Sequence, residues 1–330
     1  MIRLLRTLLA HQLKSNKPKL NHGGFTLIEL LVAMIVAVLI IAPLLRFMIT
    51  IVDTDRKEQA KATSEQEIQA AMDYIARDLE QAVYIYDNSG VERDHNDEPD
   101  ESGIQDQIPP FANEVGGCKK DNCTPVLVFW KRKHFDRDDK VNGTRIGTLT
   151  NDNDTFVYAL VAYYLITEEN DNWSNIARIG RFEIRDQVID ETSNQPNAVG
   201  IPASPGFESF DLDKEGSTLK QKLNQWTKGA GDYKTQVQIL VDYIDNTATG
   251  IRPDCPNNQN TNYLLVPSQP NGAFYACVDS TKKIAQLFLR GNALARLKNN
   301  PEDYEYTPER SSYFPTVTMQ IEGRGFLNIN

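Results

Sequence analysis

The feature that most constrains this chain is a nearly unbroken apolar run over residues 25–52, interrupted mainly by Thr26, Glu29, Arg46 and Thr50. As a helix, its 28 residues extend about 42 Å at 1.5 Å each, enough to cross a hydrocarbon core of about 30 Å. The run therefore predicts a membrane-spanning helix. An ionised carboxylate costs at least a few kcal/mol at the centre of a bilayer, so Glu29 calls for an explanation.

Charge is distributed unevenly about this run. Residues 1–24 carry five Lys or Arg and no acid, whereas Asp53, Asp55 and Glu58 follow the run directly. By the positive-inside rule, we expect a cytoplasmic N-terminus in the inner membrane and an acidic body on the periplasmic side. With −10 overall and +5 in the leader, the remainder carries −15. Such a body is a poor partner for nucleic acid, whose phosphates attract Lys and Arg.

A secretory signal peptide and an ordinary signal anchor are the simpler explanations of the run. The run is too long for a signal peptide, and no small-x-small cleavage site follows it. The small pair Gly23-Gly24 instead precedes it. Cleavage after Gly24 would remove the basic leader and create an ammonium group on Phe25, about one helical turn from Glu29. A plain signal anchor leaves Glu29 unexplained.

The sequence GFTLIE at residues 24–29, followed by the apolar helix, resembles the type III signal of type IV pilins and type II secretion pseudopilins. The resemblance implies that a prepilin peptidase cuts after Gly24 and methylates the new N-terminus at Phe25. It also implies assembly with other pilins or pseudopilins on an inner-membrane platform with a cytoplasmic ATPase. In such a filament, Glu29 would pair with the ammonium group of a neighbouring subunit, because unpaired charges are costly in a dry environment.

Pro43 lies inside the apolar run. A proline there removes a backbone hydrogen bond and favours a kink. Two readings stay open: a neutral membrane proline, and the local helix melting in assembled filaments that the family resemblance implies.

A second helical pattern covers residues 53–86. Apolar residues recur there at spacings of three and four, while Glu65, Glu67, Asp73, Arg77, Asp78 and Glu80 are expected on the other faces. We expect this stripe to pack on a domain core rather than in a coiled coil, so that residues 25–86 form one helix. The stripe comprises Ile68, Ala71, Met72, Ile75, Leu79, Ala82, Val83 and Tyr86.

Residues 87–330 are expected to form the exported globular domain. Residues 87–122 are polar and acidic without an apolar period, which predicts an exposed loop. The acids at 94, 97, 98, 100 and 101 do not have the spacing of an EF-hand, so a solvated acidic loop is favoured over a calcium site.

Strand-like runs rich in β-branched and aromatic residues follow this loop. Strands gathered after one long helix predict an α+β, pilin-like fold with an antiparallel sheet packed on the helix. The runs are Val126–Lys131, Phe156–Ile166, Ala177–Ile184, Gln236–Ile244, Ile284–Leu289 and Val317–Ile321.

The four cysteines fall into two local pairs, Cys118 with Cys123 and Cys255 with Cys277. In an exported body, two short-range disulfides are the simplest interpretation, although three pairings are formally possible. Free thiols in a cytosolic protein are the alternative. A zinc site is disfavoured because neither pair is a CxxC and the histidines are badly placed.

The chain offers few residues for catalysis, and we expect no enzymatic activity, cofactor or metal. Of the four histidines, two lie in the leader, and His95 and His134 lie in charged, loop-like contexts. No phosphate-binding glycine loop is present. The basic cluster at residues 131–134 is the best nucleic-acid candidate, but acids at 136, 138 and 139 follow it, which favours a solvated strand end.

The body is longer than that of a typical major pilin and resembles the large minor pseudopilins of the J and W type. Within that group, QVQILVDYIDNT (236–247), KKIAQLFLRGNALARL (282–297) and SYFPTVTMQIEGRG (312–325) are similar to cyanobacterial pseudopilins of hormogonium polysaccharide secretion. This resemblance implies a role in polysaccharide export for gliding motility. The alternative is a minor type IV pilus subunit for pilus priming, adhesion, motility or DNA uptake.

Overall fold

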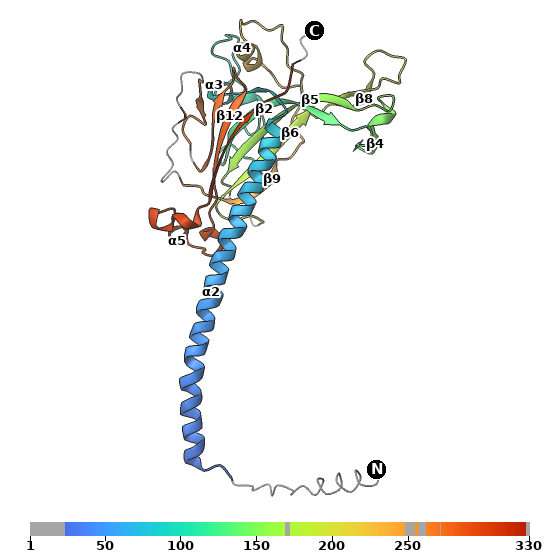
Figure 1. Ribbon diagram of the computed structural model, residues 1–330. Helices are drawn as coiled ribbons and strands as arrows, with labels where there is room; N and C mark the ends of the chain where they lie inside the picture. Colours follow the sequence, from blue (N-terminus) through green and yellow to red (C-terminus); the bar gives the residue numbers. More distant parts are fainter. Residues whose placement is uncertain (1–23, 169–171, 248–254, 257–261, 271, 328–330) are drawn as a thin grey trace, which may run out of the picture. The chain divides into compact units, whose positions relative to one another are not determined.

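The computed structural model describes residues 24–168, 172–247, 255–256, 262–270 and 272–327 (Figure 1). The basic leader before Gly24 lies outside the described residues. Contacts divide the chain into two compact units, residues 1–55 and 56–330, which are described separately. The boundary falls inside helix α2 (Leu27–Leu79).

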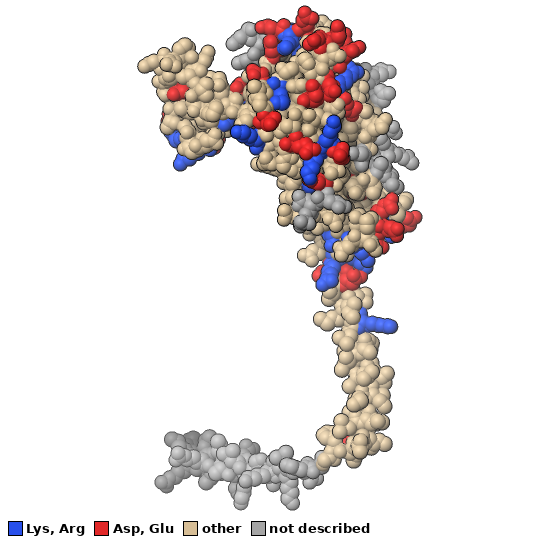
Figure 2. Space-filling model, turned by 180° about the vertical axis from the view of Figure 1, so that it is seen from behind, with Lys and Arg blue, Asp and Glu red and all other residues tan. Residues whose placement is uncertain are grey.

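The first unit contains the apolar part of α2. Its large hydrophobic side chains are all exposed, from Phe25 to Val52. The helix is long and apolar enough to cross a membrane. Figure 2 shows that this segment is almost free of charged side chains, and in the sequence its charged residues over 25–52 are Glu29 and Arg46. Pro43 lies within α2 and does not interrupt it.

The second unit is built on a five-stranded antiparallel sheet packed on the remaining part of α2. The predicted apolar stripe forms this contact, since Ile68, Met72, Ile75 and Leu79 are at most 2% exposed. The predicted α+β, pilin-like architecture is therefore confirmed. The strand order is β1 (Ala82–Ile85), β2 (Cys123–Phe135), β5 (Thr155–Ile166), β6 (Ala177–Arg185) and β9 (Gln238–Ile244).

A second antiparallel sheet of four strands completes the core. Its register is regular along β12, where Ala285 lies opposite Ile321 and Leu287 opposite Met319. At the end of β12, the backbone of residues 290–292 bonds to the end of β9 and so links the two sheets. The strands are β10 (Leu264–Val266), β11 (Phe274–Asp279), β12 (Ile284–Arg290) and β13 (Thr316–Glu322).

A small lobe extends from the ends of β2 and β5 (Figure 1). It has its own apolar cluster, made of Phe135, Ile146, Val157, Val188 and Ile201. Its elements are β3 (Lys140–Val141), β4 (Thr144–Arg145), the 3₁₀ turn η2 (Ile146–Thr148), β7 (Val188–Ile189) and β8 (Val199–Ile201). The remaining short helices are α3 (Asn88–Val91), η1 (Gln105–Gln107), α4 (Leu219–Asn224), η3 (Leu294–Arg296), α5 (Pro301–Tyr304) and η4 (Pro308–Tyr313).

The prediction that the helix runs to Tyr86 is wrong. Helix α2 ends at Leu79, and Ala82–Ile85 pair with β2 as strand β1, with Tyr84 opposite Trp130. The sequence AVYIY is apolar and rich in strand-forming residues, so it fits a buried strand as well as a helical stripe. Pairing with β2 decides between the two.

The prediction of an exposed loop over residues 87–122 is only partly correct. The five acids from Asp94 to Glu101 are exposed, as predicted. Val91, Ile104 and Ile108, however, are completely buried in the main core. The segment is anchored by the Ser102 hydroxyl, which donates to the Asn224 carbonyl at 2.9 Å. Among the described residues, no three potential ligands come together as a metal site.

Candidate functional site

The backbone before α2 presents the bond between Gly24 and Phe25 in an open position. Residues 24–26 are not helical, and a Cβ added to Gly24 would meet no atom within 4 Å. The Phe25 side chain is 78% exposed. No described side chain therefore obstructs a peptidase at this bond.

Thr26 and Glu29 form a reciprocal cap on the first turn of α2. The Glu29 N–H donates to Thr26 Oγ1 at 3.4 Å, and the Thr26 N–H donates to Glu29 Oε2, also at 3.4 Å. The Thr26 hydroxyl also contacts Oε2 at 3.4 Å. This is the pattern of a capping box, and a carboxylate there also interacts favourably with the helix dipole. The cap places Glu29 at the helix end that bears the expected cleavage bond.

Gly24 and Phe25 therefore lie directly before α2, and Glu29 lies in its first turn. Pro43 lies more than three turns further along and takes no part in this cluster. The sequence pattern identified Glu29 by its charge in an apolar run, but the capping partner Thr26 was not recognised. The spacing T-x-x-E before an apolar run is the signal that identifies such a cap.

Both local cysteine pairs form disulfides in the globular unit. Cys118 pairs with Cys123 at the start of β2, with their Cα atoms 5.1 Å apart. Cys255 pairs with Cys277 on β11, with a Cα separation of 5.5 Å. Among the described residues no cysteine is free. Each bridge ties an irregular segment to a buried strand.

A buried ionic network joins α2 to the sheet, and sequence reasoning missed it. Lys131 of β2 donates to Asp78 Oδ1 at 2.5 Å. The Tyr163 hydroxyl and the Arg181 Nε atom each donate to Asp78 Oδ2 at 2.8 Å. Lys131 also lies 3.0 Å from Glu183. Asp78 and Lys131 are only 6% and 5% exposed.

Two predictions about this network are wrong. Asp78 was expected on an exposed helix face, and Lys131 on a solvated strand end. Asp78 in fact lies three residues after Ile75 and seven after Ala71, inside the apolar stripe. Lys131 directly follows the apolar run Val126–Trp130, and that run is completely buried. Each charge is retained because the other neutralises it.

Glu183 is the second carboxylate of the network, with ion pairs to Arg181 and to Lys133 as well as Lys131. Burial alone raises the pKa of its carboxyl group. The attraction of Lys131, Arg181 and Lys133 outweighs burial and holds that pKa well below its usual range. Glu183 is therefore charged at neutral pH.

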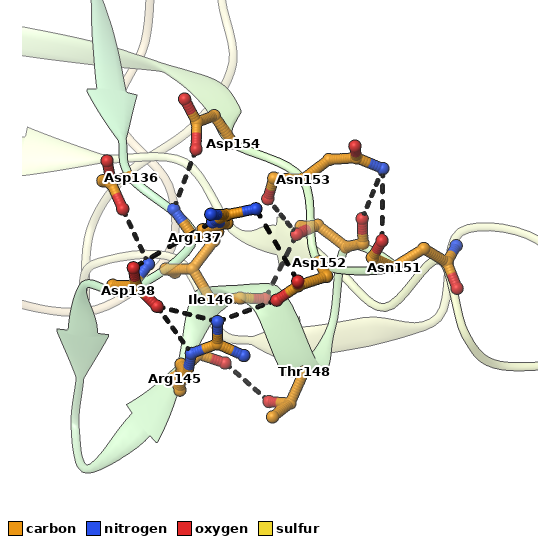
Figure 3. Close-up of polar contacts among 11 residues, drawn as sticks. Asp136, Arg137, Asp138, Arg145, Ile146, Thr148, Asn151, Asp152, Asn153 and Asp154 are labelled. Carbon is orange, nitrogen blue, oxygen red and sulfur yellow. Dashed lines mark hydrogen bonds and ion pairs between the residues drawn. The ribbon is translucent and has the colours of Figure 1, made fainter.

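The rest of the basic cluster is paired with aromatic or acidic groups. The Arg132 guanidinium lies 4.5 Å from the centre of the Phe156 ring, and His134 Nε2 lies 3.2 Å from Asp154. Figure 3 shows the adjoining lobe, where Arg145 bridges Asp138 and Asp152 at 2.7 Å each. This pairing disfavours a continuous positive surface for nucleic acid.

A family model described as the prokaryotic N-terminal methylation motif matches residues 19–45. The match includes Gly24, Phe25, Glu29 and Pro43. A comparison with curated proteins gave no match, and a comparison with solved structures gave none either. In the part of the chain that the structure describes, one helix is long and apolar enough to span a membrane, and together with the motif it indicates membrane anchoring by that helix. The motif supports a type IV pilin-like protein that is processed by prepilin peptidase and assembles with other pilins.

Proposed function

We propose that this chain is a minor pilin-like subunit, a pseudopilin, of a type II secretion or type IV pilus-like machine. The observation that carries this proposal is the Thr26–Glu29 cap directly after the open Gly24–Phe25 bond. We further propose that the machine exports an extracellular polysaccharide used in gliding motility. That finer role rests on the resemblance of residues 236–247, 282–297 and 312–325.

The proposed mechanism begins with cleavage. Prepilin peptidase cuts after Gly24, and the new ammonium group on Phe25 is methylated. The Glu29 carboxylate is already held at this end of α2 by Thr26. Because a carboxylate accepts several hydrogen bonds, Glu29 can keep its cap and still bind the ammonium group of a neighbouring subunit. A misplaced helix would leave both charges unpaired, which favours the correct register.

The subunit's role is mechanical rather than enzymatic. Before cleavage the leader lies in the cytoplasm and the globular domain in the periplasm. An inner-membrane platform with a cytoplasmic ATPase then moves the helix from the bilayer into a filament. The exposed apolar surface of α2 supports this step, because it can pack against lipid or against the helices of other subunits.

Sequencing the mature N-terminus tests processing directly. Mass spectrometry of the protein from membranes should find a methylated Phe25 as the first residue. A Gly24→Val variant should keep its leader, since the glycine is the expected recognition residue. A mature chain that begins anywhere else contradicts the proposal.

A minor subunit of a true type IV pilus is the alternative, since the same motif and helix would serve it. Such a subunit would act in pilus priming, adhesion, motility or DNA uptake. Deletion of the gene separates the two functions. Loss of extracellular polysaccharide with intact surface pili supports the secretion role, and loss of pili supports the alternative.

A further inference from the structure

A groove follows the line where α2 meets the main sheet in the globular unit. It consists of two adjoining pockets, of about 710 and 420 Å³, that share Tyr74. Both volumes are in the range of ligand-binding pockets, about 300–1,000 Å³. On α2 the lining residues recur at spacings of three and four, so one helix face borders both pockets. These residues are Glu67, Ala70, Ala71, Tyr74, Arg77 and Asp78, and Gln81 lines the smaller pocket just after the end of α2.

The larger pocket presents aromatic rings beside hydrogen-bonding groups. Tyr74 is 45% and Trp173 42% exposed, so both rings are open to a ligand in this pocket. Asp242 holds Ser174 next to Trp173, with its carboxylate 2.6 Å from the Ser174 hydroxyl. The Arg296 guanidinium lies 4.1 Å from the centre of the Tyr243 ring.

This combination suits a sugar ring. The C–H face of a sugar packs on the electron-rich face of an aromatic ring, while its hydroxyl groups require polar partners at the edge. Glu67, Asp242 and Arg296 line the same pocket and supply acceptors and donors. Glu67 and Arg296 form an ion pair, and Asp242 accepts hydrogen bonds from Ser174 and from the Tyr243 N–H. Both carboxylates have further lone pairs that can accept from sugar hydroxyl groups.

The smaller pocket has an excess of positive charge. It is lined by four cationic side chains but only two carboxylates. Asp78 and Glu183 are already engaged by Lys131, Arg181 and Lys133, and the four cations still exceed these two carboxylates by two charges. Lys133 is 31% exposed at its side chain, and Arg77 is exposed. In a chain with a net charge of −10, this local excess favours a bound anionic group.

We infer that this groove binds an acidic glycan, with sugar rings against Tyr74 and Trp173 and carboxylate groups beside Arg77 and Lys133. The inference rests on the proposed role in polysaccharide export and gives the subunit a direct contact with the exported chain. An acidic peptide could supply the carboxylates, but it has no sugar ring to cover the two exposed aromatic side chains.

The test measures polymer binding to the full-length protein in detergent micelles by isothermal titration calorimetry. Polygalacturonate is the acidic glycan, dextran the neutral glycan and polyglutamate the acidic peptide. We expect polygalacturonate to bind most tightly and its affinity to fall with added salt. Trp173→Ala and Tyr74→Ala should each weaken binding about 2- to 10-fold through lost stacking. Arg77→Gln should weaken polygalacturonate binding and reduce its salt dependence.

Matched controls are Lys214→Gln and Leu219→Ala, exposed residues that do not line the groove. Both should bind polygalacturonate like the wild type. Circular dichroism verifies that each variant is folded, which is expected because the substituted groove residues are exposed.

Three results would overturn the inference: no binding of polygalacturonate, equal binding of dextran, or polyglutamate binding that is at least as tight and insensitive to Trp173→Ala. The last would assign the groove to an acidic peptide. The deletion phenotype remains independent of this test. Lost polysaccharide export without glycan binding would remove the groove assignment and leave the proposed function intact.

Discussion

At the scale of single residues, Glu29 has two separable properties, a hydrogen-bonding carboxyl group and a negative charge. The cap with Thr26 requires only an acceptor, whereas pairing with a neighbour's ammonium group requires the charge. The structure contains the first interaction and the proposed filament the second. Substitutions can distinguish them.

We expect Glu29→Gln to be cleaved normally but to be depleted from filaments, because the amide keeps the cap and loses the charge. Thr26→Ala is the matched control, since it removes the cap at a cost of about 1 kcal/mol and retains the charge. Cleavage is measured by N-terminal mass spectrometry, and assembly by immunoblotting of sheared filaments. Normal assembly of Glu29→Gln would rule out the charge-pairing role.

The Asp78–Lys131 pair is the second feature at this scale. Removing one partner leaves a buried charge unpaired, so Lys131→Met should lower the free energy of unfolding by about 3–5 kcal/mol. In the double variant Asp78→Leu, Lys131→Met, the free energy of unfolding should fall by less than the sum of the decreases in the two single variants. Denaturant unfolding of the full-length protein measures both effects.

Glu58→Ala is the control for this pair, because Glu58 and Lys61 form an exposed ion pair. Its loss should change the free energy of unfolding by no more than about 1 kcal/mol. A Lys131→Met variant as stable as Glu58→Ala would show that the network does not secure α2 to the sheet.

At the scale of elements, the second half of α2 holds the globular unit through one apolar face. Met72 is completely buried, so Met72→Ala should cost about 2–5 kcal/mol. Gln66→Ala, at an exposed position of the same helix, should change stability by less than about 0.5 kcal/mol. Equal effects of the two variants in thermal unfolding would contradict this packing.

The two disulfides should contribute differently to the free energy of unfolding, because they close loops of different length. Sequence separations of 22 and 5 residues predict about 3 kcal/mol for Cys255–Cys277 and about 2 kcal/mol for Cys118–Cys123. Paired Cys→Ala variants, compared under oxidising conditions by denaturant unfolding, measure this difference. The reverse order would show that local packing, rather than loop closure, determines the contributions.

The accuracy of the strand predictions also has a reason at this scale. All six predicted runs coincide with strands of the two main sheets, because each is long and rich in β-branched or aromatic residues. The missed strands are short or lie in ambiguous sequence. Strand β11, Phe274–Asp279, is defined by its pairing with β12 over its full length. Strand β1 was missed because its apolar residues continue the three- and four-residue spacing of the helix before it.

At the scale of the whole molecule, the ionic network makes stability depend on pH. The folded-state pKa of Glu183 is depressed below its ordinary value of 4.5. A depressed pKa contributes stability above the unfolded value and loses it as the pH falls toward the folded value. The globular unit should therefore become less stable as the pH falls below about 4.5.

Glu183→Gln should be less stable than the wild type at pH 7. Its free energy of unfolding should also decline less steeply below pH 4.5, because glutamine has no carboxylate to protonate at this position. Glu101→Gln, which changes an exposed acid, should follow the wild type. Unfolding free energies at pH 7 and between pH 4.5 and 2.5 provide the comparison. Parallel pH curves for Glu183→Gln and the wild type would contradict the role of Glu183.

The sequence alone determined the features that depend on neighbouring residues. The cleavage motif, the apolar helix, the six long strands and the local cysteine pairs all follow from short-range composition, periodicity and spacing. Only the tertiary structure determined the features that depend on residues far apart in the sequence. The end of α2 required pairing with β2, the burial of Asp78 required Lys131, 53 positions away, and the groove required Tyr74 beside Trp173. The residues next to a position in the sequence cannot specify such contacts. The partner that neutralises a buried charge, or that packs on an apolar helix face, comes from a distant part of the chain and is placed only when the chain folds.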